Sequence, residues 1–582
     1  MPAETVYDYI IIGSGVSGAL AAYKLAQKPG NPKVLVIEAA DAPWATEPLF
    51  TQLSNAADNS GDIALRKELM KEWALSPTRS TLSPYTKLGS NATIPSPDGG
   101  SKADLERYYE LKQAPDNDRE FWKATYQRLV GGSTWTWRGN CPRLVPNDFL
   151  MRSQYGRAVD WPFGYDILEP YYTMAERELG VACDGDAWSE HYHGAFRSAA
   201  FPMPAIVHSY SDLRVRERLG YDFTVDGVPI HVLPTPQARN SQAYDNNGAQ
   251  VKRPACEGNG NCIPICPIGA KYDASVHVRA AKRKGVEFWT HRAVHSLELD
   301  GATQLIGQVV YIDWKSGSME KKRVKGRNVV LAMHAIENAR LLLFSGLANS
   351  SKKVGLNLMD HLNNEMVGLM PEHIFPFRGP QGTASIPAFC DGTFRSKRMA
   401  YNITFGNDGW GRTEEPSKSL GDLVDKGIIG AEMRSKFTDR IWRQLRFSFS
   451  GEQLPYEHNK VTLGDRKDPL GIPVPRITNS LDDYSRAGFI HAQQTLRTIL
   501  QKLGCTEIKP QDPILEFRTA GHIMGTTRMG SDRTTSVVDP DGRSHDHPNL
   551  WVVGSSVFPT GATANPTLTI AAVTLRTVDK MN

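Results

Sequence analysis

Two runs of consecutive apolar residues open the chain, with a glycine-rich turn and a helical segment between them. The first run covers residues 9–12, the turn residues 13–18 and the helical segment residues 19–26, and the second run is KVLVIE at residues 33–38. The second run lacks the apolar–polar alternation of a strand with one face in water, so we expect a strand buried on both faces. This stretch is predicted to form a strand–helix–strand unit with a parallel sheet.

Similar apolar runs recur later in the chain. NVVLA at residues 328–332 and NLWVV at residues 549–553 are typical of buried strands, and helical patterns follow them, one through Leu343 and one from about Pro566. Residues 286–299 and 309–313 also have strand composition. We expect these segments to belong to the same α/β unit as the first strands.

A different pattern covers residues 350–508. Its strands are shorter, and turns such as DRKDPLG lie between them, which favours an antiparallel sheet in a second domain. Residues 482–502 have the pattern of a long amphipathic helix. Residues 43–118 are polar and rich in proline and serine, and we interpret them as excursions outside the core.

Charge and cysteine content exclude several classes of protein. The 67 basic and 63 acidic residues give a net charge of +4 over 582 residues, which argues against a nucleic-acid partner. No apolar stretch reaches the roughly 18 residues of a membrane span, and the first residues lack the pattern of a secretory signal. Seven scattered cysteines do not make a disulfide scaffold.

The first glycine-rich turn has the spacing of a dinucleotide site. Gly13, Gly15 and Gly18 form G-x-G-x-x-G between a predicted strand and a predicted helix. Such glycines allow the tight turn, the approach of a pyrophosphate and close helix packing. Glu38 ends the second strand, where its carboxylate can accept hydrogen bonds from ribose hydroxyls. The alternative is a chance glycine-rich turn. If the motif does bind a dinucleotide, its position so near the N-terminus favours FAD over NAD.

Three cysteines fall within the segment CEGNGNCIPICPIGA. Cys256, Cys262 and Cys266 have the spacing C-x5-C-x3-C-P in a loop at residues 254–270 with little regular structure. The spacing leaves three readings open, namely an iron–sulfur centre, a zinc site or structural thiols. The other cysteines are interpreted as packed thiols. Two His-x-His pairs, at residues 191–193 and 545–547, are predicted to be solvated turns.

Four further segments resemble one family along nearly the whole chain. They are VGGSTWTW (residues 130–137), VGLNLMDH (354–361), HIMGTTRMG (522–530) and the C-terminal segment at 537–572. In order and spacing the chain resembles the glucose–methanol–choline (GMC) oxidoreductases, in particular the catalytic subunits of bacterial membrane-associated FAD sugar dehydrogenases. The resemblance implies an α/β fold with an FAD-binding Rossmann-like domain and a second, antiparallel-sheet substrate domain. The expected division is 1–180, 225–350 and 508–582 for the FAD-binding domain and 181–224 and 351–507 for the substrate domain.

The resemblance also implies cofactor contacts, which the residues alone do not show. Without it, GGSTWTW would be interpreted as a turn with two core tryptophans. In the family, the residues that match 131–134 lie along the flavin. The residue that matches Val294 meets the adenine through its backbone. The residues that match 565–567, in the C-terminal segment, also bind the cofactor. The positions carried over are Gly131, Gly132, Ser133, Thr134, Val294, Asn565, Pro566 and Thr567.

Oxidation of an alcohol needs a base for the hydroxyl proton and an acceptor for the hydride. The flavin would accept the hydride, and a histidine suits the base because its pKa lies near working pH. The family pair is a histidine with a second histidine or an asparagine, and the matching residues are His522 and Asn565. We expect His522 to be the general base and Asn565 to hold the substrate oxygen. The alternatives are a loop histidine bonded to backbone and a structural turn asparagine.

The chain departs from the family pattern at three places. Thr136 stands where some relatives carry a histidine bonded covalently to flavin, so we expect non-covalent FAD. The residues after NVVLA are Met333, His334 and Ala335 instead of Ala-Gly or Asn-Gly, and Gly554 replaces a common acidic residue. The last two departures concern local flavin contacts and not the fold.

Related sugar dehydrogenase subunits hold a three-iron [3Fe-4S] cluster in a similar cysteine loop. The resemblance therefore favours such a cluster on Cys256, Cys262 and Cys266, with electrons leaving to a membrane-anchored multihaem cytochrome c subunit. It also implies a small export or chaperone subunit and a place at the periplasmic face of a bacterial inner membrane; without an exporting partner the chain would stay cytoplasmic. The substrate would be a sugar, glycoside, polyol or sugar acid. An oxidase using O2 and a non-catalytic flavin- or metal-binding subunit are the alternatives.

Overall fold

A computed structural model describes most of the chain. It covers residues 5–39, 109–112, 126–249, 251–258, 262, 266–301, 303–314, 318–407, 416–468, 470–510 and 518–581. The predicted excursion at residues 43–118 lies outside the described residues, apart from 109–112.

The apolar runs at the start of the chain form the centre of a mixed sheet. Its strands are β1 (Val6–Ile12), β2 (Val34–Ile37), β7 (Glu287–Trp289), β8 (Arg292–Leu299), β9 (Ile306–Asp313), β10 (Lys321–Leu331) and β19 (Leu550–Val552). β1 pairs in parallel with β2 and β10, and β19 pairs in parallel with β10, whereas β8 and β9 are antiparallel. All four residues of β2 are buried, as its continuous apolar pattern predicts.

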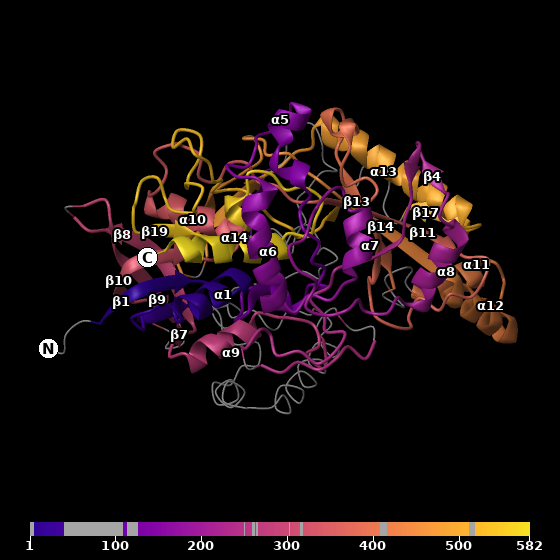
Figure 1. Ribbon diagram of the computed structural model, residues 1–582, viewed down its shortest axis with the longest axis horizontal. Helices are drawn as coiled ribbons and strands as arrows, with labels where there is room; N and C mark the ends of the chain where they lie inside the picture. The colour runs from indigo at the N-terminus through magenta and orange to yellow at the C-terminus, as the bar shows by residue number, and fades with distance from the viewer. Residues whose placement is uncertain are drawn as a thin grey trace.

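Helices cover both faces of this sheet (Figure 1). They are α1 (Val16–Leu25), α6 (Tyr165–Leu179), α9 (Ser275–Arg283), α10 (Ala335–Ser345) and α14 (Thr567–Lys580). α1 packs against α9 and α14, and α14 packs against α6. The predicted helices near the N-terminus and the C-terminus are therefore neighbours in space, which brings the first glycine-rich turn close to the last helix.

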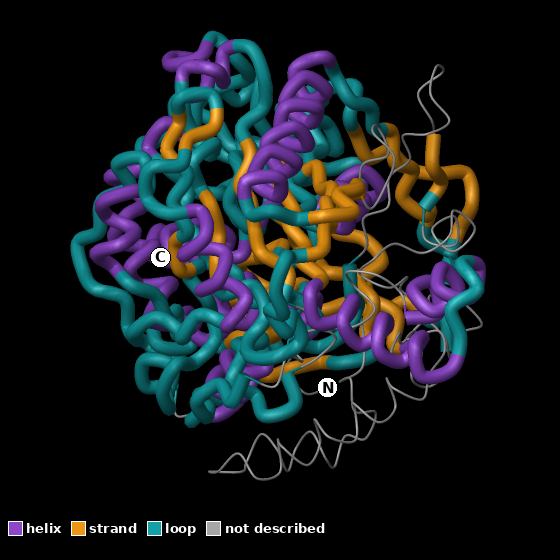
Figure 2. Tube along the Cα trace, turned by 90° about the vertical axis from the view of Figure 1, so that its right-hand side faces the viewer, coloured by secondary structure: helices purple, strands orange, loops and turns teal. Residues whose placement is uncertain are grey.

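The second half of the chain forms the predicted antiparallel sheet. Its strands are β6 (Leu233–Pro234), β11 (Leu362–Leu369), β12 (Ala384–Ile386), β13 (Tyr401–Gly406), β14 (Gln444–Gly451), β17 (Thr506–Pro510) and β18 (Arg518–Thr519). α13 (Asp483–Lys502) packs across β11, β14 and β17 (Figure 2). This helix confirms the amphipathic pattern, because Phe489, Leu496 and Leu500 lie buried on its inner face.

Smaller elements complete the fold. The other strands are β3 (Glu110–Lys112), β4 (Thr224–Val225), β5 (Val228–Pro229), β15 (Lys460–Lys467) and β16 (Pro473–Thr478). The further helices are α5 (Met151–Tyr155), α7 (Gly185–His191), α8 (Tyr210–Leu219), α11 (Pro416–Asp425) and α12 (Gly430–Arg443), with short 3-10 turns η2 (Gly132–Trp135), η3 (Pro146–Phe149), η5 (Thr393–Ser396) and η6 (Ser555–Val557). The sequence patterns above did not predict α11 and α12, which lie beside the antiparallel sheet in Figure 1.

The two sheets confirm the predicted fold class, but strands cross the expected division. β6 and β18 belong to the antiparallel sheet, although their residues were expected in the FAD-binding domain. Strands of two residues have no readable hydrophobic pattern, so pairing with β12 and β11 decides where they lie. The exact division into two domains stays a prediction.

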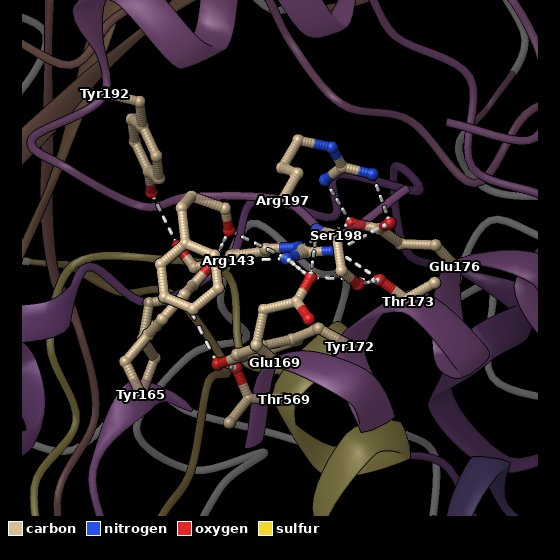
Figure 3. Close-up of polar contacts among 12 residues, drawn as sticks. Arg143, Tyr165, Glu169, Tyr172, Thr173, Glu176, Tyr192, Arg197, Ser198 and Thr569 are labelled. Carbon is tan, nitrogen blue, oxygen red and sulfur yellow. Dashed lines mark hydrogen bonds and ion pairs between the residues drawn. The ribbon is translucent and has the colours of Figure 1, made fainter. Parts of the chain in front are cut away.

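A buried charge cluster joins α6 to the segment before it (Figure 3). Arg143 donates to both oxygens of Glu176, at 2.8 and 3.0 Å, and to Glu169 at 2.9 Å. Arg197 also pairs with Glu176, so two guanidinium groups balance two carboxylates. Because burial of a charge is costly unless it is paired, this balance lets the cluster lie in the interior. Tyr172, on the same helix, bonds Thr569 in the first turn of α14 at 2.9 Å.

Candidate active site

A cavity of about 460 Å³ lies between the two sheets. Its walls come from the first glycine turn, η2, residues 520–523, the start of α14 and strands β11, β13 and β14. The volume is within the roughly 300–1,000 Å³ of ligand pockets. Segments from both ends of the chain therefore meet at one site.

The first glycine turn has the geometry of a phosphate-binding loop. Gly13 has φ +99°, and a Cβ there would meet the Ala332 carbonyl oxygen at 2.9 Å. A Cβ at Gly18 would lie 1.9 Å from the Gly13 carbonyl oxygen, so glycine allows the close packing of strand and helix. Gly15 lines the cavity, and a Cβ there would meet nothing within 4 Å. The open space at Gly15 and the N-terminus of α1 fit an incoming phosphate group.

Glu38 lines the same end of the cavity and is 7% exposed. Its Oε2 accepts hydrogen bonds from the backbone nitrogen and the hydroxyl of Ser14, at 2.9 and 2.6 Å. The carboxylate therefore holds the glycine turn itself as well as facing the space where a ribose was expected.

The second glycine turn packs directly on the first. A Cβ at Gly132 would approach the Gly15 Cα at 3.3 Å, and the Gly131 backbone nitrogen donates to the Ser14 carbonyl oxygen at 3.2 Å. Gly132 lines the cavity with Ser133 and Thr134, whereas Gly131, at φ +92°, turns the chain behind it.

The remaining predicted contact residues line the cavity from two different elements. Val294 of β8 lies in the wall formed by the mixed sheet. Asn565, Pro566 and Thr567 lie where α14 begins. The free backbone N–H groups of a helix N-terminus favour negative charge on a ligand there.

The departures from the family pattern also lie at the cavity. Thr136, Met333, His334 and Gly554 all line it. The His334 ring stacks on Tyr126 at 4.0 Å, and its Nδ1 accepts from the first turn of α10. Burial lowers the pKa of His334 to about 3, so the ring is neutral.

The two residues predicted for catalysis meet in this cavity. Asn565 Nδ2 lies 3.1 Å from His522 Nε2. On the other side of the ring, His522 Nδ1 lies 2.9 Å from Nδ1 of His361, whose Nε2 lies 3.2 Å from the Gly561 carbonyl oxygen.

These contacts assign the tautomers. A carbonyl oxygen only accepts, so Nε2 of neutral His361 carries its proton and its Nδ1 is an acceptor. His522 must then donate from Nδ1, which leaves a lone pair on His522 Nε2. That atom faces Asn565 in the cavity, where its lone pair can accept a proton from a ligand hydroxyl.

Asp360 holds the two histidine segments together. Its Oδ1 accepts from the backbone nitrogens of His361 and His522, at 2.6 and 2.8 Å, and its Oδ2 accepts from Gly521 at 3.1 Å. Burial raises the pKa of Asp360 to about 7, against the opposing effect of these donors. Asp360 and His361 end the family segment VGLNLMDH, but the sequence alone predicted no role for either residue.

Burial also lowers the pKa of His522 well below its usual value, and the neighbouring His361 adds to the effect. Desolvation lowers the pKa of His361 to about 4. Both rings are thus neutral at neutral pH, which removes any charge repulsion between them. The pKa of the expected base therefore lies below the ordinary histidine value, because burial disfavours the charged ring.

The three cysteines of the predicted cluster loop are all among the described residues. Cys262 and Cys266 are buried and Cys256 is half-buried. Burial raises the pKa of Cys256, and the thiols of Cys262 and Cys266 raise it further. The charge of Arg239 acts in the opposite direction and lowers this pKa. Among described residues, no three side chains of His, Cys, Asp or Glu are arranged to hold a metal ion. Residues 259–261 and 263–265 of this loop are outside the description.

Two buried cations contact the cysteine loop. Arg239 Nη1 donates to Cys262 Sγ at 2.9 Å. Lys271 Nζ donates to the carbonyl oxygens of Trp135, Trp137 and Cys262, at 2.8, 2.6 and 2.7 Å. Lys271 therefore connects the cysteine loop directly to the second glycine turn.

The His-x-His pairs do not form metal sites in the described structure. His191 stacks on His231, and His193 bonds the Pro387 carbonyl oxygen at 2.9 Å. His547 is buried and bonds the backbone of Ala348, so the prediction of a solvated turn is wrong there. Packing against a segment far away in sequence decided this.

Known families match three parts of the chain. A family model described as "GMC oxidoreductase" matches residues 235–363 and a second one residues 455–574, and an "NAD(P)-binding Rossmann-like domain" matches residues 11–48. The fructose dehydrogenase large subunit of Gluconobacter japonicus is 32% identical over 98% of this chain and 97% of its own length. The chain belongs to the GMC oxidoreductase family.

Other relatives are named for different activities. Paromamine 6'-oxidase of Streptomyces fradiae is 30% identical over 78% of this chain and 79% of its own length. Gluconate 2-dehydrogenase flavoprotein of Pantoea cypripedii is 25% identical over 76% and 77%. The solved pyridoxine 4-oxidase from Mesorbium loti has a TM-score of 0.62 at 18% identity and covers 99% of both chains, which shows the shared fold.

Family membership makes this chain an FAD-dependent enzyme acting on CH–OH donors. The open space at Gly15, the two helix N-termini and the paired glycine turns fit that cofactor. No described helix is both long enough and apolar enough to span a membrane.

Proposed function

We propose that this GMC enzyme is a dehydrogenase that oxidises a hydroxyl of a sugar, glycoside, polyol or sugar acid. The observation that carries the proposal is the contact between His522 Nε2 and Asn565 Nδ2 in a cavity shared with the glycine turns. Bound FAD, held non-covalently since Thr136 offers no ring nitrogen, supplies the acceptor for the hydride.

His522 and Asn565 have separate roles in this proposal. The lone pair on His522 Nε2 takes the hydroxyl proton of the substrate. The Asn565 amide donates a hydrogen bond to the same substrate oxygen as its negative charge grows. His361 keeps the His522 ring in the required tautomer, and Asp360 positions the backbone of both histidines.

Most residues proposed to contact the cofactor line the cavity, and Gly18 and Gly131 belong to the same two glycine turns without lining it. Gly13, Gly15 and Gly18 with the N-terminus of α1 would receive the pyrophosphate, and Glu38 the ribose. Contacts with the rings are proposed for the second glycine turn, Val294 and the start of α14. The residues concerned are Gly131, Gly132, Ser133, Thr134, Val294, Asn565, Pro566 and Thr567.

The pH profile should reflect the lowered pKa of His522. The neutral ring accepts a proton and the protonated ring does not, so proton abstraction by His522 is lost as pH falls through its pKa. We expect kcat/KM to stay level from pH 8 down past 6.5, the ordinary histidine value, and to decline only at more acidic pH. A fall centred at or above 6.5 in steady-state assays would contradict this assignment.

The cysteine loop is proposed to bind a [3Fe-4S] cluster through Cys256, Cys262 and Cys266. Arg239 supports this, because the residue is 1% exposed and its hydrogen bonds to other described residues go to neutral groups apart from the Cys262 sulfur. A buried cation needs a counter-charge, which a thiolate would supply. The Gly258 backbone nitrogen, 3.4 Å from Cys256 Sγ, is a further donor to sulfur. Such a cluster would supply one-electron transfer away from the site.

Partner proteins follow from the same proposal. The relative from Gluconobacter is named a large subunit, which implies other subunits in that protein. We propose a cytochrome c partner as electron acceptor and a small export subunit, with the enzyme at the periplasmic face of a bacterial inner membrane. The basis is the position of the cysteine loop, which Lys271 connects to the second glycine turn.

A dye-linked assay tests the proposed function. Purified enzyme is offered a panel of sugars, glycosides, polyols and sugar acids with an artificial electron acceptor, and peroxide is measured in parallel under air. We expect dye reduction to exceed peroxide formation by at least about tenfold, because bound iron–sulfur centres direct electrons to a partner. Abundant peroxide would instead indicate an oxidase, and turnover of no substrate would favour a non-catalytic subunit.

A further inference from the structure

Two rows of polar side chains cross the antiparallel sheet on the face that lines the cavity. Glu365 of β11 lies beside Ser448 of β14, and Ser448 lies beside Thr404 of β13, with their hydroxyl oxygens 2.8 Å apart. Two residues further along each strand, on the same face of the sheet, Asn363 lies beside Ser450. All five side chains line the same cavity as His522 and Asn565. This wall therefore offers one carboxylate among several neutral polar groups.

The next row explains how the carboxylate is held. Arg446 of β14 lies between Val367 and Gly406, and its Nη1 donates to Glu365 Oε1. The Arg446 side chain is 1% exposed, whereas that of Glu365 is 14% exposed. A Cβ at Gly406 would lie 2.5 Å from Arg446 Nε, so glycine leaves the space in which the guanidinium lies across the sheet. Arg446 is thus buried beneath the cavity wall, and its hydrogen bond orients the Glu365 carboxylate that is exposed at the wall.

One neighbouring group lacks a partner. The Ser450 hydroxyl is buried and forms no hydrogen bond within the described structure, although Ser450 lines the cavity. A buried hydroxyl without a partner is unfavourable, so a ligand that supplies one gains affinity. A substrate rich in hydroxyl groups would satisfy Ser450 and the row beside it.

We propose that Glu365 selects neutral polyhydroxylated substrates, meaning sugars, glycosides or polyols, over sugar acids. An ionised carboxylate only accepts hydrogen bonds, so adjacent substrate hydroxyls can donate to it. The same charge repels the carboxylate of a sugar acid, which gives discrimination through an unfavourable contact with the wrong substrate. This inference rests on the proposed function and narrows its substrate class.

The test replaces the charge and keeps the shape. Glu365→Gln is compared with wild type on pairs of substrates, each pair a neutral sugar and the corresponding sugar acid. Hydrogen bonds to a charged group are stronger than those to a neutral one, so we expect KM for the neutral sugar to rise about 10- to 100-fold with a smaller change in kcat. The preference for neutral sugar over acid, as the ratio of kcat/KM values, should fall by at least about tenfold.

Glu298→Gln is the matched control, because Glu298 also pairs with an arginine, Arg323, but on the outer part of the mixed sheet. It should leave both KM values and the preference unchanged. FAD absorbance and melting temperature report whether each variant folds. If Glu365→Gln fails to bind FAD, Glu365→Asp serves instead, and it should raise KM for the neutral sugar while the enzyme still rejects the acid.

The outcomes separate the two proposals. Wild-type enzyme that oxidises no member of the panel refutes the proposed function. Wild-type enzyme that prefers sugar acids, or a Glu365→Gln variant whose preference stays within about twofold of wild type, refutes the role of Glu365 alone. Equal loss of activity on both substrates of a pair would also refute it, since a merely structural residue acts in that way.

Discussion

Replacing His522 with alanine is expected to lower kcat in the dye-linked assay by about 10²- to 10⁴-fold, the usual contribution of a positioned general base. The lone pair on Nε2 faces Asn565 in the cavity, and removal of the ring leaves no other proton acceptor at that atom's position. KM should change less, because Asn565 and the sheet wall still contact the substrate. Stopped-flow measurement of flavin bleaching by substrate should show the same loss.

Fold and cofactor content should survive the change. The His522 side chain lines the cavity, so its truncation enlarges a space that already exists instead of opening a new hole in the core. His373→Ala is a suitable control, because His373 is 42% exposed and pairs with Asp439. A His522→Ala enzyme with kcat within about threefold of wild type would refute the assignment of the base.

Replacing Cys262 with serine is expected to abolish electron delivery to a cytochrome acceptor. A serine hydroxyl is a much poorer ligand for iron than a thiolate, and Arg239 would lose its counter-charge at the Cys262 sulfur. Iron and acid-labile sulfide content should fall to background, and the cluster's visible absorption should disappear. Reduction of the flavin by sugar in a single turnover should persist, since the His522–Asn565 contact lies on other segments.

Cys505→Ser is the control for this experiment. Cys505 is half-buried and lies 3.5 Å from the Met370 sulfur, away from the cysteine loop. This variant should keep its iron content and its cytochrome reduction. Wild-type enzyme purified without oxygen that contains no iron, or a Cys262→Ser variant that reduces cytochrome at the wild-type rate, would refute the cluster.

The sequence by itself determined the local parts of this protein. The continuous apolar pattern of residues 33–38 predicted a strand buried on both faces, and β2 is such a strand. The spacing of Gly13, Gly15 and Gly18 predicted a phosphate loop, and a Cβ at Gly13 or Gly18 would indeed collide with backbone, whereas Gly15 leaves open space for a ligand. The resemblance to the family then predicted that His522 and Asn565 share one site, which the contact between them supports.

Tertiary structure decided everything that depends on partners distant in sequence. His361 and His522 are separated by 161 positions, and only their contact with each other and with the Gly561 carbonyl oxygen assigns the proton-accepting atom. The lowered pKa of His522 has the same origin, because burial is a property of the folded chain and not of a motif.

The sheet wall shows the same limit. A polar residue at alternate positions of a strand predicts a face in water, yet Glu365 and Ser448 face an internal cavity. Pairing of β11, β14 and β13 places them in one row, and the space at Gly406 admits Arg446 behind them. Side-chain alternation identifies the two faces of a strand, but what each face meets depends on how distant segments pack against it.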